Sequence, residues 1–445
     1  MKNVYIKLFN IKWVASLSEK DLPTLDEIHK YSTKSKLLED PYVKKVWDLS
    51  GDPDLFSKSP DYLAKLRRDL LRESLRFFIR KSRFYADLME RLEVDPGAAE
   101  VEDLVKLAVP SELLRGEGYR RLLIEDVLEE PGHVFSSSGT SSSIPVRVYR
   151  TYLELAMMVK ANTRLFEYVY GGTLKEGRGI ALFLAAKELR NQLNFVAFVD
   201  LALQGKKIPL VYGMDLVVGT GEGGSKWTKL VPNKNRVLEF LKSKEEPKLF
   251  FTAPAGVYLL SKQMIEMNSL KRVIYRLATG APPVDLGRGG VVVTGGGSKG
   301  MDVPPYADIV SYSRKVFKAR NERGDLVDAP FMDVLGMTET LTALIDKYGV
   351  MNKVPHPLQE VFIVDPKTYK IVNEPGKEGI LGIYDPLAVS WLEVFLPGDI
   401  VKFYESGRYY GRELVYVRRL TKEEGWDLQR ACGGTIEEMM RRGSS

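Results

Sequence analysis

A run of small hydroxyl-bearing residues around one glycine spans Phe135 to Pro145, with the sequence Phe-Ser-Ser-Ser-Gly-Thr-Ser-Ser-Ser-Ile-Pro. Such a loop can wrap a polyphosphate, because its hydroxyls and backbone N–H groups donate hydrogen bonds without crowding the phosphate oxygens. It lacks the Gly-Lys-Ser/Thr of a Walker A loop. The alternative is a flexible Ser/Gly linker. Because the run lies between strand-like and helical segments rather than between two domains, the sequence favours phosphate binding.

A second candidate is the segment from Val291 to Gly300, where an apolar strand opens into Gly295, Gly296 and Gly297, followed by Lys299. Glycines let a backbone approach a nucleotide closely, and a lysine can sit beside a phosphate or a carboxylate. A tight glycine turn with a surface lysine explains the same residues equally well.

The third candidate is the pair Thr338 and Glu339, within the sequence Asp-Val-Leu-Gly-Met-Thr-Glu-Thr that begins at Asp333. Thr338 could donate to a phosphate, and Glu339 could bind the Mg²⁺ that accompanies ATP. Considered alone, the pair is better explained as the cap and first-turn acid of a helix that begins near Glu339.

A glycine–aspartate pair at a strand start, Gly398-Asp399, is followed by Gly411-Arg412. An aspartate in this setting can bind ribose hydroxyls, and an arginine can reach a phosphate. Gly-Asp is also an ordinary turn, so the pattern is weak alone.

The chain has one cysteine, Cys432, which follows Arg430 and precedes two glycines and a short helical run. A nearby cation or helix N-terminus favours the thiolate form and hence nucleophilic attack. The alternative is a small buried apolar residue, which is the usual environment of a free cysteine.

Strand-like apolar runs alternate with helical segments from about Val134 to Pro355, which predicts an α/β fold with a mostly parallel sheet flanked by helices. Each strand ends in small or polar residues, where open α/β sheets place their ligand crevice. Helical spacing predicts a long basic helix from Ser59 to Leu92 and another at Tyr306–Arg323. We expect four regions: an N-terminal helical region (1–130), an α/β core (131–355), a β-rich subdomain (356–410) and a short C-terminal lobe (411–445).

The composition of the 445 residues is that of a globular protein able to bury a large core. The net charge of +6 comes from 65 basic and 59 acidic residues, and the basic residues are not clustered with aromatics. We therefore expect no nucleic-acid partner. The single cysteine excludes an internal disulfide and predicts a cytoplasmic setting. Polar residues interrupt the apolar N-terminus, so we expect no membrane span.

The order of these motifs along the chain resembles the adenylate-forming superfamily of acyl-CoA synthetases, luciferases and peptide-synthetase adenylation domains. The run from Thr294 to Lys299 resembles more specifically the acyl-protein synthetases of bacterial luminescence (long-chain-fatty-acid–luciferin-component ligases), with phenylacetate-CoA ligase close by. The resemblance covers about Arg76 to the C-terminus. It implies the adenylate-forming fold, in which ATP and Mg²⁺ activate a carboxylic, often fatty, acid as acyl-AMP before a thiol takes the acyl group.

The resemblance also implies roles for individual residues. Thr338 would contact the α-phosphate, Glu339 would bind Mg²⁺ and Asp399 would bind the ribose. Arg412 would match the arginine near the hinge of the small lobe, and Cys432 would carry the acyl group. The phosphates would be held by Ser137, Ser138, Gly139, Thr140 and Ser141.

Two departures from the superfamily pattern help to distinguish an acyl-protein synthetase from a CoA ligase. Val146 stands after Pro145, where the superfamily often has a lysine, and the tail after Gly411 is too short for the mobile lobe that carries the catalytic lysine. Both favour acyl transfer to Cys432 and onward to an acyl reductase or acyl-carrier partner. The alternative enzyme is an aryl- or acyl-CoA ligase that uses CoA, and the alternative class is a nucleotide sensor or scaffold on a degenerate adenylation fold.

Overall fold

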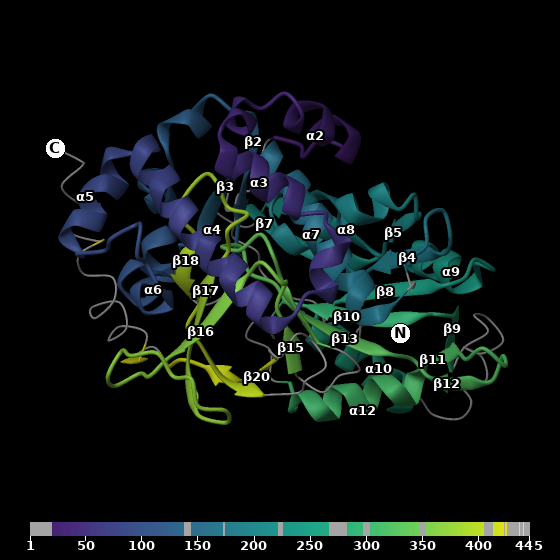
Figure 1. Ribbon diagram of the computed structural model, residues 1–445. Coiled ribbons are helices and arrows are strands. Elements are labelled where there is room, and N and C mark those ends of the chain that lie inside the picture. The colour runs from purple at the N-terminus through teal and green to yellow at the C-terminus, as the bar shows by residue number, and fades with distance from the viewer. Residues whose placement is uncertain are drawn as a thin grey trace.

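The computed structural model describes residues 20–137, 144–171, 174–220, 226–266, 283–296, 303–346, 352–404, 413–421, 423–424, 436 and 439. Within these residues, thirteen strands form one continuous sheet, which has a parallel half and an antiparallel half (Figure 1). The α/β fold with a parallel core flanked by helices is therefore confirmed.

The parallel half contains five strands in the order β13-β10-β8-β4-β5. Alternate residues of its central strands point to opposite faces, as the register shows. Val292 pairs with Phe250 and packs on one face, whereas Val293 pairs with Phe251 and packs on the other. Both faces are buried, which explains why these strands read as continuous apolar runs. The bounds are β4 (Ile180–Phe183), β5 (Leu210–Tyr212), β8 (Lys248–Thr252), β10 (Val291–Gly295) and β13 (Phe331–Leu335).

The antiparallel half continues from β13 through β14, β15, β20, β19 and β17 to β18, with β16 also paired to β17 and the short β1 parallel to β18. The residues expected to form a β-rich subdomain therefore hydrogen-bond into the same sheet as the parallel core. The bounds are β1 (Val109–Pro110), β14 (Leu344–Asp346), β15 (Asn352–Val354), β16 (Glu360–Val364), β17 (Glu378–Tyr384), β18 (Val394–Leu396), β19 (Asp399–Tyr404) and β20 (Glu413–Arg419).

Smaller sheets attach to this body. The hairpin of β2 (Gly132–Ser136) and β3 (Arg147–Thr151) flanks the predicted phosphate loop, and a second hairpin joins β6 (Met214–Thr220) to β7 (Lys226–Pro232). A three-stranded sheet contains β9 (Val284–Arg288), β11 (Phe317–Arg320) and β12 (Leu326–Asp328).

Helices cover both faces of the parallel strands: α7 and α8 on one side, α10 and α12 on the other (Figure 1). The helix α7 begins at a capping box, in which Thr151 and Glu154 each satisfy the other's backbone N–H. The bounds are α2 (Leu25–Ser32), α3 (Pro41–Leu49), α4 (Pro60–Lys81), α5 (Arg83–Arg91), α6 (Val101–Leu107), α7 (Tyr152–Tyr170), α8 (Asn194–Gly205), α9 (Lys234–Lys242), α10 (Pro254–Glu266) and α12 (Tyr306–Val316).

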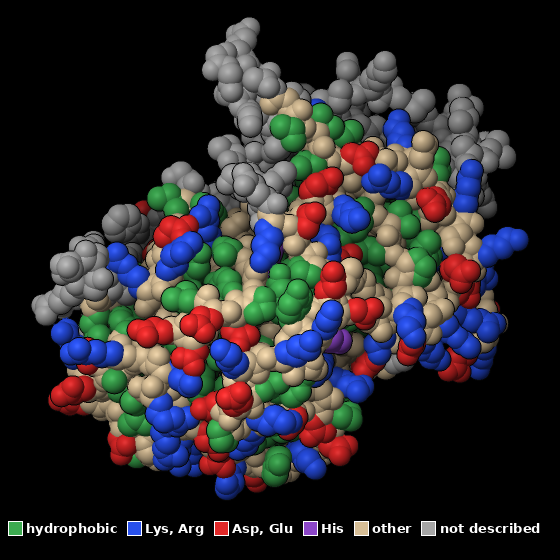
Figure 2. All heavy atoms as spheres, turned by 90° about the horizontal axis from the view of Figure 1, so that it is seen from above, with side chains coloured by type: hydrophobic (Ala, Val, Ile, Leu, Met, Phe, Trp, Pro, Cys, Tyr) green, Lys and Arg blue, Asp and Glu red, His purple; other side chains and the backbone are tan. Residues whose placement is uncertain are grey.

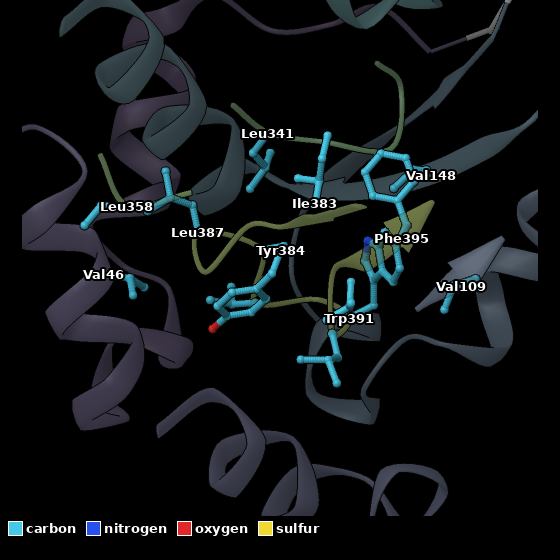
Figure 3. Packing of buried hydrophobic residues seen from close by; sticks show 14 of the residues in the cluster. Val46, Val109, Val148, Leu341, Leu358, Ile383, Tyr384, Leu387, Trp391 and Phe395 are labelled. Atoms are coloured by element: carbon cyan, nitrogen blue, oxygen red, sulfur yellow. The ribbon is translucent and has the colours of Figure 1, made fainter. Parts of the chain in front are cut away.

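The N-terminal helices pack on the antiparallel half and share its core. Figure 3 shows this contact around Tyr384, Trp391 and Phe395, all of which are fully buried. The Tyr384 hydroxyl donates to the hydroxyl of Ser74 on α4 at 2.8 Å, so the polar tip of this core side chain is satisfied.

Two helix boundaries differ from the sequence prediction. The expected helix from Ser59 to Leu92 is broken at Ser82, whose extended backbone (φ −154°, ψ 124°) separates α4 from α5. The expected helix at Tyr306–Arg323 ends at Val316, because Phe317 begins strand β11 and stacks on Phe250 of the main sheet at 4.9 Å between ring centroids. At the second boundary, tertiary packing overrides the helical spacing.

Basic and acidic side chains are mixed over the face of the molecule that Figure 2 shows. One basic residue of the expected helix, Arg67 of α4, is not at the surface: it is buried and forms an ion pair with Glu360. Among the helices that the structure describes, none is both long and apolar enough to cross a bilayer.

Candidate active site

A cavity of about 550 Å³ opens at the C-terminal ends of the parallel strands β4, β8, β10 and β13. This is the edge at which open α/β sheets bind ligands. The cavity brings together three of the sequence-predicted motifs, which are spread over about 200 residues of the chain. Its lining includes Ser137, Gly295, Gly296, Thr338, Glu339 and Arg419.

Ser137 lies where the predicted phosphate loop leaves β2. Its backbone N–H donates to the carbonyl of Val146 at 2.9 Å, and its hydroxyl accepts from the N–H of Val146 at 3.0 Å. The two ends of the loop are therefore closed on each other by the β2–β3 hairpin, rather than lying between a strand and a helix. Ser138, Gly139, Thr140 and Ser141 lie outside the described residues.

The glycine turn after β10 forms part of the cavity wall. A side chain at Gly295 would place its Cβ 2.5 Å from the ring of Phe195 on α8, so any other residue here would force that ring to move. Gly296 has φ +80°, a left-handed conformation that favours glycine. Gly297 and Lys299 lie outside the described residues.

Thr338 and Glu339 lie in an irregular segment, 336–343, between β13 and β14. No helix begins near Glu339, so the interpretation of this pair as a helix cap is wrong. Both residues line the cavity, and Glu339 is only 9% exposed. Burial raises the pKa of Glu339, while its own backbone N–H and the nearby Arg419 and Arg150 lower it.

Because segment 336–343 has no secondary structure of its own, neighbouring side chains hold its backbone. Asn162 of α7, Asn194 of α8 and Asp385 act as the anchors, each through hydrogen bonds to the segment. The bonds run from Asn162 Nδ2 to Leu341 O (2.8 Å), from Ala343 N to Asn162 Oδ1 (2.8 Å), from Asn194 Nδ2 to Met337 O and Thr340 O (both 3.2 Å) and from Thr342 N to Asp385 Oδ2 (2.8 Å).

A fully buried arginine lies directly behind Glu339. Arg150 of β3 donates through Nη2 to the backbone carbonyl of Glu339. Its Nη1 lies 2.8 Å from Oε2 of Glu393 and 3.9 Å from Oε1 of Glu154. Burial raises the pKa of Glu393, and the Arg150 charge opposes that shift. Arg150 therefore fixes the peptide of the predicted Mg²⁺ ligand from inside the core.

Asp399 begins β19 and is 2% exposed. Nη1 of Arg419, on the adjacent strand β20, lies 3.0 and 3.1 Å from the two carboxylate oxygens of Asp399. Burial raises the pKa of Asp399, Arg419 lowers it, and the negative charge of Glu339 raises it further. Arg412 and Cys432 lie outside the described residues.

Most of the large apolar side chains that line the cavity belong to one hydrophobic cluster, which we call its apolar end. They come from α8, the turn before it, the end of β4 and β7, and Phe183 and Phe195 meet edge to face at 5.6 Å between ring centroids. This end suits a hydrocarbon or aromatic group rather than a second phosphate. It consists of Phe183, Leu189, Leu193, Phe195, Phe198 and Leu230.

No group of three or more histidine, cysteine, aspartate or glutamate side chains in the described part of the chain is arranged to hold a metal ion. Mg²⁺ commonly uses one or two protein carboxylates together with substrate phosphates. Glu339, as the carboxylate that lines this cavity, fits such an ion when a nucleotide supplies the remaining oxygens.

No model of a protein family matches the sequence, and a search of curated proteins finds no match. Solved structures do match. Two crystal structures of 2-hydroxyisobutyryl-CoA ligase, both in complex with 2-HIB-AMP and CoA, are similar to this chain. The open conformation aligns with a TM-score of 0.55 at 14% identity, over 82% of this chain and 75% of the other. The thioesterification state aligns with a TM-score of 0.54 at 15% identity, over 82% and 69%.

The chain shares the fold of this CoA ligase. At 14–15% identity the likeness to the CoA ligase is one of fold alone and assigns no role to individual residues of this chain.

Within this ligase fold, the sequence motifs missed the residues that hold the motifs in place. Arg150 and Arg419 lie in strands with no motif, and Asn194 begins a helix that the sequence did not predict. Arg115, which also lines the cavity, stands in the N-terminal region. Of these residues, only Arg150 could have been suspected from its local sequence. It lies within an alternating strand, and an arginine in a buried strand needs a charged or hydrogen-bonding partner.

Proposed function

We propose that this chain activates a carboxylic acid with ATP, forming acyl-AMP and pyrophosphate. The observation that carries the proposal is the convergence of Ser137, Gly295, Thr338 and Glu339 in one cavity at the C-terminal edge of the parallel strands. Arg419 lines the same cavity, and Asp399 lies directly behind it as its ion-pair partner. A degenerate nucleotide sensor would not need the buried carboxylate of Glu339 beside an apolar acyl-sized end.

The reaction divides the cavity between nucleotide and acid. Ser137 and the loop that follows it would bind the phosphates, Thr338 the α-phosphate, and Asp399 the ribose. Lys299 and Arg412 are proposed to contribute positive charge to the same site. Glu339 would hold Mg²⁺, which neutralises phosphate charge when bound. The rest of catalysis is positioning, since adenylyl transfer needs little covalent chemistry from the protein.

The apolar end of the cavity would hold the hydrocarbon body of the acid. Phe183, Phe195 and Leu230 enclose this end, and none of them can pair with a charged group. The carboxylate would then face Thr338 and Glu339, where its oxygen can attack the α-phosphate. A fatty or an aryl acid fits this division, whereas a polar dicarboxylic acid would leave a charge unpaired.

In the second step we propose that the acyl group passes to Cys432 and onward to a partner protein or another thiol. Cys432 is the only thiol of the chain. The alternative acceptor is CoA, which is favoured by the fold similarity to a ligase whose structures contain CoA.

Acid-dependent exchange of pyrophosphate into ATP tests the first step. With a panel of fatty and aryl acids, we expect exchange that depends on the acid and on Mg²⁺. Exchange with no acid in the panel would contradict the adenylation proposal and favour a nucleotide sensor.

Retention of a labelled acyl group tests the second step. With radiolabelled acid and ATP, the wild-type chain should keep the label through denaturation, whereas Cys432→Ser should lose it and keep full pyrophosphate exchange. If Cys432→Ser forms acyl-CoA at the wild-type rate, Cys432 is not the acyl carrier and CoA is the direct acceptor.

A further inference from the structure

The predicted phosphate loop contains no positive charge of its own. The eleven residues from Phe135 to Pro145 include neither lysine nor arginine, and Val146 follows them. The β- and γ-phosphates of ATP carry several negative charges, which enzymes balance with arginine, lysine or metal ions. A cation that reaches this loop must therefore come from another part of the chain.

Arg115 lies at the base of the loop. It forms an isolated antiparallel bridge with Val146, and the N–H of the next residue, Gly116, donates to the carbonyl of Pro145 at 3.0 Å. Nη1 of Arg115 donates to the carbonyl of Ile144 at 2.9 Å. Residues paired across an antiparallel bridge project to the same side, with neighbouring Cβ atoms. Arg115 and Val146 accordingly both line the cavity, together with Ser137.

Among the described residues that line the cavity, Arg115 and Arg419 are the two that carry positive charge. Arg419 is balanced by both carboxylate oxygens of Asp399 at 3.0 and 3.1 Å. Arg115 forms an ion pair with Glu112, with 3.8 Å between Nη2 and Oε1, and the two side chains are 23% and 42% exposed, respectively. A pair this long and partly exposed contributes little to stability, so Arg115 can exchange it for a phosphate.

We propose that Arg115 is the residue that binds the β- and γ-phosphates of ATP and stabilises the departing pyrophosphate. The inference rests on the proposed adenylation. In that step a carboxylate oxygen forms a bond to the α-phosphorus, and the bond from the α-phosphorus to the bridging oxygen breaks. The electron pair of that bond leaves with pyrophosphate, and the guanidinium of Arg115 stabilises the negative charge that develops on the pyrophosphate oxygens. Asp399 and Thr338 would serve the AMP half, whereas the role of Arg115 would be confined to the β- and γ-phosphates.

Binding of ATP, pyrophosphate and AMP to the full chain, measured by calorimetry, tests this division. Arg115→Gln should weaken ATP and pyrophosphate by about 10- to 100-fold, because one charged hydrogen-bonding group is lost. Binding of AMP should stay unchanged. Arg120→Gln removes an arginine of the same region that pairs with Glu117 outside the cavity, and it should leave all three affinities unchanged.

A second variant tests whether the lost affinity reflects the missing positive charge at this place in the cavity or a disturbed fold. Adding Val146→Lys to Arg115→Gln places a cation on the cross-strand partner, and it should restore at least a tenth of the ATP affinity. The inference is overturned if Arg115→Gln binds ATP as wild type does, if it loses AMP and ATP equally, or if the lysine restores nothing. A wild-type chain that binds neither ATP nor pyrophosphate would overturn the proposed function as well, which separates the two failures.

Discussion

Glu339→Gln is expected to lower acid-dependent ATP–pyrophosphate exchange by roughly 100-fold or more. Glutamine keeps the shape of the side chain but removes the negative charge that would hold Mg²⁺ against the phosphates. Glu339 lines the cavity and is 9% exposed, so water cannot easily replace the lost ligand. The measurement is the exchange rate at saturating acid, with thermal unfolding to show that the fold is intact.

The pH dependence of the same variant gives an independent readout. Because burial raises the pKa of Glu339 above its ordinary value, this carboxylate becomes protonated at a higher pH than an exposed glutamate does. Wild-type exchange should therefore fall as the pH drops through that pKa, and the ratio of wild type to Glu339→Gln should shrink.

Glu374→Gln is the matched control, since Glu374 is exposed on the loop between β16 and β17. It should have no effect on exchange at any pH. A constant ratio between wild type and Glu339→Gln across the acid range would show that the charge of Glu339 does not act in catalysis.

The parallel core could be predicted from sequence because both of its faces are buried. A strand covered on two sides must be apolar throughout, so the runs at β4, β8 and β10 stand out against amphipathic helices. The end of α12 could not be predicted in this way. The stretch from Tyr306 to Arg323 keeps helical spacing, and only the stacking of Phe317 on Phe250 from a distant strand decides where the helix stops.

In the candidate site, too, some residues can be recognised from local sequence and others only from distant contacts. Local patterns pointed to Ser137, Thr338 and Glu339, all of which line the cavity. Hydroxyl groups, glycines and a carboxylate at the ends of strands can be recognised from the residue types alone. The contacts that hold them could not be identified. The position of Arg150 in a buried strand predicts that it has a partner, but this partner is the carbonyl of Glu339, 189 positions away, and only the folded chain brings the two together. Charge balance is likewise a property of the folded chain, as the pair Asp399–Arg419 illustrates.

Arg150→Met is expected to destabilise the protein by about 3–5 kcal/mol at neutral pH. Methionine fills a similar volume, but it leaves Glu393 fully buried without the guanidinium 2.8 Å away. Glu154 is less affected, because its Oε1 also accepts from the backbone N–H groups of Val389 and Ser390, each at 2.9 Å. Urea unfolding of wild type and variant measures the difference in the free energy of unfolding.

The deficit should depend on pH in a defined direction. Without Arg150, the pKa of Glu393 in the folded protein rises further above its unfolded value. A raised carboxyl pKa costs stability only as the pH climbs above the unfolded value, about 4.3. Wild type carries part of this cost, because the pKa of its folded Glu393 is already raised. The difference between wild type and Arg150→Met should therefore be smallest in acid and grow as the pH rises above the folded pKa of Glu393 in wild type.

A double variant separates the stability of the core from the positioning of Glu339. Arg150→Met with Glu393→Met removes both charges, so most of the lost free energy of unfolding should return. Pyrophosphate exchange should stay low, because neither methionine can donate to the carbonyl of Glu339. If the double variant is no more stable than Arg150→Met, the unpaired Glu393 charge is not the cause of the deficit. If exchange recovers together with stability, Arg150 serves the core alone, and the anchors on α7 and α8 suffice to position Glu339.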